Sequence, residues 1–225
     1  MKSTPASAEL ESLGEDEVHV WHFAYQHARA RAPLLTLLAR YTGATDTTLA
    51  IGEHGRPRLA QAMAGLDFNW SHSGARAVLA VARGIAPGID IECAGERARA
   101  MDLARRFFHA DETAALLALP QEQRNAAFFE LWTAKEAVLK ATGHGISFGL
   151  HRLRVLRDGA LRLDWLDGDD AAAWQLHALA LGDGCTGALA WRGRPRRVVL
   201  RALATPTACV QCALPPSPLT PTTPS

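Results

Sequence analysis

The chain has 225 residues, 48% of them hydrophobic, and its 24 Lys and Arg residues almost balance 23 Asp and Glu residues, for a formal net charge of +1. That hydrophobic share suffices for a folded core and excludes an intrinsically disordered protein. A net charge near zero gives no general attraction to nucleic acid or to an anionic membrane, and no apolar run approaches the roughly 20 residues of a membrane-spanning helix.

The N-terminal part predicts a flexible segment, a strand and a helix, in that order. Residues 1–17 are polar, residues 18–23 have strand character, and residues 28–41 form an apolar stretch with helical character. The N-terminus lacks the basic stretch, apolar core and cleavage site of a secretory signal, and the four cysteines are mostly scattered. We therefore expect a cytoplasmic protein with reduced thiols.

The central part changes from strands to helices. Residues 77–81 and 88–92 are rich in strand-forming residues and are separated by a Gly- and Pro-containing turn, so a hairpin is predicted. Helical signals dominate from residue 99 to residue 142, with Asp111 as the predicted N-cap of one helix. Pro120 separates that helix from a longer one that ends at Gly143.

The C-terminal part returns to strands and then loses the composition of a core. The predicted strands are residues 153–156, 161–165, 174–181, 187–191 and 197–203. The tail at 205–225 is rich in Pro and Thr and is predicted to be disordered, and its Cys209 and Cys212 are interpreted as two free thiols. The order of strands, helices and strands indicates an α+β fold.

Two carboxylates are the first candidates for chemistry. Asp90 and Glu92 lie two residues apart in a predicted strand, and a strand's period of two places both on one face. Mg²⁺ prefers oxygen ligands, and a few carboxylates suffice when a diphosphate completes the shell. The alternative is an exposed strand face that carries two solvated acids.

A third carboxylate lies on the long helix. Helical spacing places Trp132, Glu136 and Lys140 in one row, with Lys135 about 100° away from Glu136 around the helix axis. A carboxylate flanked by two ammonium groups is what transfer from a diphosphate needs. The alternative is an ordinary stabilising pair between Glu136 and Lys140 on an exposed helix.

Hydroxyl, imidazole and guanidinium groups precede these residues. Ser71 and His72 are sequence neighbours, which would point to opposite faces of a strand, so a Ser-His hydrolase is disfavoured. Both suit hydrogen bonding to phosphate, or else belong to a polar turn. Arg31 and Arg56 are further candidates for phosphate binding, although single surface arginines are usually just solvated.

Four blocks in order resemble the 4′-phosphopantetheinyl transferase superfamily, in its long single-chain type related to the surfactin-synthetase activator. They read Gly55-Arg56-Pro57, Phe68-Asn69-Trp70-Ser71-His72-Ser73, Gly88-Ile89-Asp90-Ile91-Glu92 and Trp132-Thr133-Ala134-Lys135-Glu136-Ala137-Val138-Leu139-Lys140. The resemblance extends from about residue 28 to residue 146. Their order and spacing make the match specific.

The resemblance implies an activity and a set of site residues. The enzyme would transfer the 4′-phosphopantetheine group of coenzyme A to a serine of an apo acyl or peptidyl carrier protein, with Mg²⁺, and release 3′,5′-ADP. Asp90, Glu92 and Glu136 would bind the metal, and Glu136 and Lys140 would be the catalytic residues, with Glu136 as base directly or through a metal-bound water. The residues implied in coenzyme binding are Arg31, Arg56, Ser71, His72, Lys135 and Lys140.

The resemblance also implies two similar α/β halves related by a pseudo-twofold axis, with the active site between them. We expect these halves at residues 18–97 and 100–204, between a flexible segment at 1–17 and the tail at 205–225. A monomer is expected, because a site between two halves of one chain needs no partner. Two rival functions remain: a non-catalytic module that binds coenzyme or carrier, suggested by a short N-terminal region, and a metal-dependent phosphohydrolase.

Overall fold

The computed structural model describes most of the chain between residues 12 and 203. The described residues are 12–29, 31–44, 47–52, 55–61, 63, 65–93, 99–182 and 184–203. The predicted tail, with Cys209 and Cys212, lies outside them, as do residues 97 and 98 at the predicted boundary between the halves. None of the helices in these ranges has the length and apolar character needed to cross a membrane.

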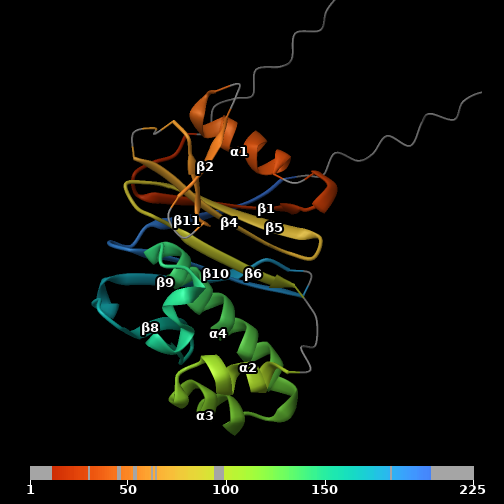
Figure 1. The fold of residues 1–225 in the computed structure, drawn as a ribbon, viewed down its shortest axis with the longest axis vertical. Helices are drawn as coiled ribbons and strands as arrows, with labels where there is room; N and C mark the ends of the chain where they lie inside the picture. Colours follow the sequence, from red (N-terminus) through yellow and green to blue (C-terminus); the bar gives the residue numbers. More distant parts are fainter. Residues whose placement is uncertain are drawn as a thin grey trace, which may run out of the picture.

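The described elements form stacked layers of helix and sheet (Figure 1). The outermost layer at one end is α1 (Ala32–Thr42), preceded by the short 3-10 helix η1 (His27–Arg29). It covers a four-stranded sheet with the order β11 (Arg197–Ala202), β1 (Glu17–Ala24), β5 (Arg76–Arg83) and β4 (Leu66–Ser73). β11 runs parallel to β1, and the other neighbours are antiparallel.

A second sheet packs against the first, and α4 covers its far face (Figure 1). Its antiparallel strands have the order β6 (Gly88–Cys93), β10 (Cys185–Arg192) and β9 (Trp174–Ala180). α4 (Gln121–Thr142) ends at Gly143, whose φ of 79° is the left-handed conformation favoured at a helix C-terminus. α2 (Ala100–Phe107) and α3 (Ala110–Ala118) lie beyond α4.

Two small hairpins and further 3-10 helices complete the described fold. The hairpins are β2 (Leu49–Ile51) with β3 (Pro57–Leu59), and β7 (Leu153–Arg157) with β8 (Leu161–Leu166). The 3-10 helices are η3 (Ile146–Phe148), η4 (Leu150–Arg152) and η5 (Ala171–Ala173). The α+β class is confirmed, and the strands predicted after residue 150 are present within a few residues of their predicted bounds.

The two sheets exchange strands along the chain. β6 precedes the helical segment but pairs with β10 in the second sheet, and β11 returns from the C-terminal part to pair with β1 in the first. Each sheet therefore contains strands from both predicted halves. This exchange joins the two sheets through the backbone as well as through their shared core.

The alternation of side chains along β6 determines what faces each neighbour. Ile89 and Ile91 are buried in the core between the sheets, where Val78 and Ala80 of β5 also lie. Because side chains alternate along a strand, Asp90 and Glu92 then lie on the other face of β6, toward α4. The helix approaches closely at Gly88, because a Cβ atom there would lie 2.0 Å from the carbonyl oxygen of Ala137.

Two local predictions were wrong. β5 and β6 do not form a hairpin, because the turn between them carries β6 into the second sheet, whereas β5 pairs with β4 and β1. The N-cap of α3 is His109 rather than Asp111. The His109 ring accepts from the Asp111 amide, and Glu112 accepts from the His109 amide, which completes a capping box.

The prediction of reduced thiols was also wrong for two of the cysteines. Cys93 at the end of β6 and Cys185 at the start of β10 are partners in the strand register and form a disulfide. Their separation of 92 residues concealed the pairing, because only the register of β6 against β10 brings them together.

Candidate functional site

The seam between β4 and β6 is joined by side chains instead of a backbone ladder. Alternate residues of β4 point toward β6, and Asn69 Oδ1 accepts from the Ile89 amide at 2.9 Å. Ser73 Oγ accepts from the Cys93 amide at 3.1 Å and donates to Glu92 Oε2 at 2.9 Å. The polar side chains of β4 thus hold the edge of the strand that carries both predicted metal-binding carboxylates.

Asp90 is the centre of the polar contacts at this seam. Its Oδ1 accepts from Ser71 Oγ and from Lys140 Nζ, both at 2.7 Å. Lys140 Nζ also donates to the carbonyl oxygen of Ile89 at 3.1 Å. The structure therefore brings together three predicted site residues from β4, β6 and α4.

Glu136 faces the same seam from α4 and is only 5% exposed. Its Oε1 is buried and has no hydrogen-bond partner among the described residues. Burial, with further contributions from the charges of Asp90 and Glu92, raises the pKa of Glu136 to about 7 against the opposing effect of Lys140. A buried carboxylate with one oxygen that no described residue satisfies, and with two like charges nearby, is chemically suited to accept a cation.

The carboxylates do not form a preformed metal site. Within the described ranges, no three His, Cys, Asp or Glu side chains are gathered as closely as a bound ion requires. Asp90 instead forms an ion pair with Lys140. The donor set of Asp90, Glu92 and Glu136 suits Mg²⁺ in charge and ligand type, and binding would need at least one of these side chains to move toward the others.

Lys135 lies away from the seam, so the structure does not bring it together with the other predicted site residues of α4. Its side chain is fully buried on the face of α4 that packs against α3, and its Nζ lies 2.6 Å from Glu112 Oε2. The same ammonium donates to the carbonyl oxygens of Leu150 at 2.9 Å and Leu153 at 2.5 Å. Burial lowers the pKa of Lys135 to about 8, and Glu112 opposes that change. Its three donors are occupied by the protein.

Arg56 lies beside the seam, and its guanidinium group is bonded to the protein. Its Nη1 donates to the Lys140 carbonyl at 2.7 Å, near the end of α4. Its Nη2 donates to Asp67 Oδ2 and to the carbonyl oxygens of Phe68 and Pro87 at 3.1–3.2 Å. Arg56 thus fixes the C-terminal end of α4 against β4 and the turn before β6.

His72 lies on the opposite face of β4 from Ser71, because neighbours in a strand alternate between its two faces. Its exposed ring stacks on Tyr25 with centroids 4.4 Å apart, and the rings of His27 and Trp70 lie within 5.6 Å. Desolvation, with the charges of His27 and Lys140, lowers the pKa of His72. A lowered pKa favours the neutral imidazole, which has one donor and one acceptor for hydrogen bonds.

One predicted site residue, Arg31, remains to be placed, and three residues at the site were not predicted. Arg31 is exposed at the start of α1. Asn69 and Ser73 were missed as site residues because no strand was predicted at residues 68–73, although their spacing of two from Ser71 was a usable signal. Gly88 was missed because only a folded structure shows how closely α4 approaches it.

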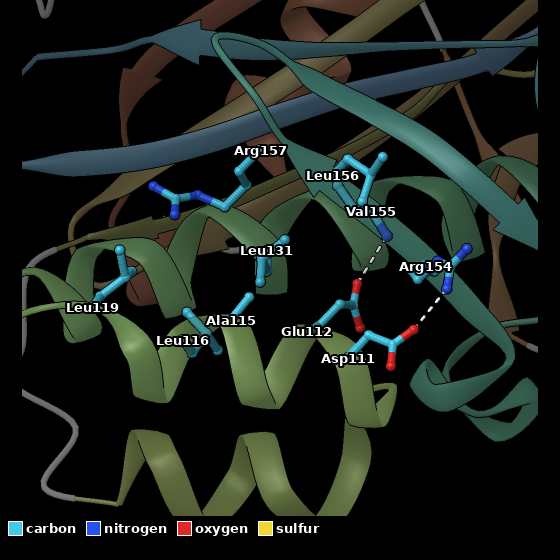
Figure 2. A pocket seen from close by; sticks show the side chains of 10 residues that line it. All are labelled: Asp111, Glu112, Ala115, Leu116, Leu119, Leu131, Arg154, Val155, Leu156 and Arg157. Carbon is cyan, nitrogen blue, oxygen red and sulfur yellow. Dashed lines mark hydrogen bonds and ion pairs between the residues drawn. The ribbon is translucent and has the colours of Figure 1, made fainter.

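A separate cavity of about 220 Å³ lies between α3, α4 and β7 (Figure 2). It is lined mainly by apolar side chains, with the Asp111–Arg154 ion pair at its rim. Glu112, which lines it, binds the Val155 amide at 2.8 Å. The carboxylates of the β4–β6 seam do not contribute to it, so this cavity is distinct from the candidate site.

Fold and site together define an α+β protein with carboxylates and a lysine at the seam of β4, β6 and α4. The family model of the 4′-phosphopantetheinyl transferase superfamily matches residues 86–190. The 4′-phosphopantetheinyl transferase HetI of a Nostoc species is 35% identical over 167 residues, which are 72% of this chain and 69% of that protein. The chain belongs to the 4′-phosphopantetheinyl transferase superfamily.

Two further matches cover smaller shares of this chain. The 4′-phosphopantetheinyl transferase psf-1 of Bacillus pumilus is 42% identical over 131 residues, which are 56% of this chain and 53% of that protein. The crystal structure of the Thermotoga maritima holo-[acyl-carrier-protein] synthase matches with a TM-score of 0.40 and 20% identity, over 49% of this chain and 64% of that one.

Proposed function

We propose that the chain transfers the 4′-phosphopantetheine group of coenzyme A to a serine hydroxyl of an apo acyl or peptidyl carrier protein and releases 3′,5′-ADP. The observation that carries this proposal is the meeting of Asp90, Glu92, Glu136 and Lys140 at one seam, in a chain of this superfamily. Cytoplasmic location, a monomeric state and a pseudo-twofold relation between two halves belong to the same proposal.

Asp90, Glu92 and Glu136 would hold Mg²⁺ together with the diphosphate of coenzyme A. When bound, the metal supplies charge neutralisation on the phosphoryl oxygens. Lys140, whose side chain is 25% exposed, would turn from Asp90 toward a phosphate oxygen once a cation competes for that carboxylate. Ser71 would keep Asp90 in place during this exchange, because its hydroxyl already donates to Oδ1.

The reaction forms a bond from the carrier serine oxygen to the phosphorus that bears the pantetheine arm. The bond from that phosphorus to the oxygen of the adenosine-side phosphate breaks, and 3′,5′-ADP leaves with the electron pair. The serine proton would pass to Oε1 of Glu136, the buried oxygen that lacks a partner among the described residues. His72 and Arg31 remain proposed contacts for the coenzyme phosphates.

Intact-protein mass spectrometry of apo carrier proteins tests the proposal. The purified protein is incubated with coenzyme A, Mg²⁺ and a panel of carriers, with EDTA and Glu136→Gln as controls. A mass gain of one phosphopantetheine group, lost in both controls, is expected. Coenzyme binding without a mass gain would indicate a non-catalytic module, and release of phosphopantetheine without a carrier would indicate a phosphohydrolase.

A further inference from the structure

Ser73, the last residue of β4, touches both a predicted metal ligand and the backbone beside it. Its Oγ donates to Glu92 Oε2 at 2.9 Å and accepts from the Cys93 amide at 3.1 Å. A backbone N–H can only donate, so the amide occupies a lone pair of the hydroxyl and leaves the hydroxyl proton for the carboxylate. The direction of both hydrogen bonds is therefore fixed.

We propose that Ser73 is a positioning residue that fixes the Glu92 carboxylate for divalent cation binding. This inference rests on the metal site of the proposed function. A glutamate side chain has several rotatable bonds, and a hydrogen-bonded partner restricts them before the cation arrives. Such partners of metal ligands typically change metal affinity about 10- to 100-fold when they are removed.

The backbone around Ser73 and Glu92 is held from two sides, so the Ser73 hydroxyl is a hydrogen-bond donor in a fixed position for Glu92. On one side, β4 pairs with β5 up to the Ser73–Arg76 register pair. On the other, the disulfide ties Cys93, the residue that follows Glu92, to β10. Loss of the Ser73 hydroxyl should therefore remove one restraint on the Glu92 carboxylate while the strands stay in place.

Ser71 and Ser73 then act as a pair with separate tasks. Ser71 donates to Asp90, which is additionally held by Lys140, and Ser73 donates to Glu92 two residues further along. The same spacing of two on β4 and on β6 matches one hydroxyl to each carboxylate. The site is thus arranged by two parallel sets of side chains across the seam.

Manganese binding tests the inference directly, because Mn²⁺ can replace Mg²⁺ and its free form is measured by electron paramagnetic resonance. The titration uses the full chain with saturating coenzyme A. Ser73→Thr and Ser73→Val form the matched pair, since they differ by a hydroxyl in place of a methyl group. Ser73→Ala is the third variant, and Ser147→Ala removes an exposed hydroxyl that binds only its own loop, at the carbonyl oxygen of His144.

We expect Ser73→Val and Ser73→Ala to bind Mn²⁺ about 10-fold more weakly or worse, with Ser73→Thr and Ser147→Ala close to the unmodified chain. Carrier modification by the two weak variants should recover as Mg²⁺ is raised, which a general loss of structure would not allow. Equal affinity of the Thr and Val variants would overturn the inference alone. Failure of the unmodified chain to bind Mn²⁺ would overturn the metal site and the inference with it.

Discussion

Replacement of Lys135 by methionine separates a structural role from a catalytic one. The ammonium is fully buried and lies 2.6 Å from Glu112 Oε2, whose side chain is 2% exposed. Methionine keeps much of the volume of lysine but leaves the Glu112 carboxylate without its counter-ion. Breaking a buried ion pair from one side costs about 3–5 kcal/mol. We expect Lys135→Met to lower the free energy of unfolding by about that amount.

Urea denaturation measures this loss, and a thermal scan should show a midpoint lower by on the order of 10 °C for a chain of this size. A second change, Glu112→Gln in the Lys135→Met background, removes the stranded charge and should restore part of the stability. Its amide oxygen can still accept the hydrogen bond from the Val155 amide, now at 2.8 Å from Glu112.

Lys140→Met is the matched control, because the ammonium of Lys140 lies at the seam and its side chain is 25% exposed. We expect a smaller loss of stability and a large loss of phosphopantetheine transfer, the reverse of the pattern for Lys135→Met at temperatures where both variants are folded. If Lys135→Met were as stable as the unmodified chain yet bound coenzyme A weakly, the buried location argued for Lys135 would be refuted.

Three further perturbations test other parts of the structure. Gly88→Ala should cost about 3 kcal/mol and reduce transfer, since its Cβ would collide with the backbone of α4, and urea denaturation with a transfer assay checks both. Cys93→Ser with Cys185→Ser should lower the free energy of unfolding by about 2–4 kcal/mol, because a long loop loses its closure. Nuclear magnetic resonance should find the pKa of His72 below its usual value, and His27→Gln should raise it.

The lowered pKa of His72 also predicts how the stability of the folded chain depends on pH. Because its pKa is lower in the folded chain than in the unfolded one, the unfolded chain binds more protons between these two values. Stability contributed by the neutral ring is therefore present above the unfolded pKa and is lost as the pH falls through the folded one. Stability that instead rose on acidification through this range, relative to a His72→Phe variant, would contradict the assignment.

Periodicity was sufficient for the parts of the site that lie on strands. Asp90 and Glu92 could be placed on one face of β6, and Ser71 and His72 on opposite faces of β4, because a strand offers only two directions. The same rule could not show which strand lies opposite. The pairing of β6 with β10, and with it the disulfide, depends on contacts between residues at least 92 positions apart.

The long helix shows why the remaining assignments needed the structure. Helical spacing placed Lys135 about 100° from Glu136, and both lie in a segment with the charges of a phosphate-binding site. α4, however, is covered on one side by the second sheet and on the other by α2, α3 and β7, so its buried residues encircle the helix and no polar face marks the site. One lysine could therefore be buried against Glu112 while the other reached Asp90, and the sequence pattern is compatible with either assignment. What distinguishes them is the partner each ammonium finds, which is a property of the folded chain.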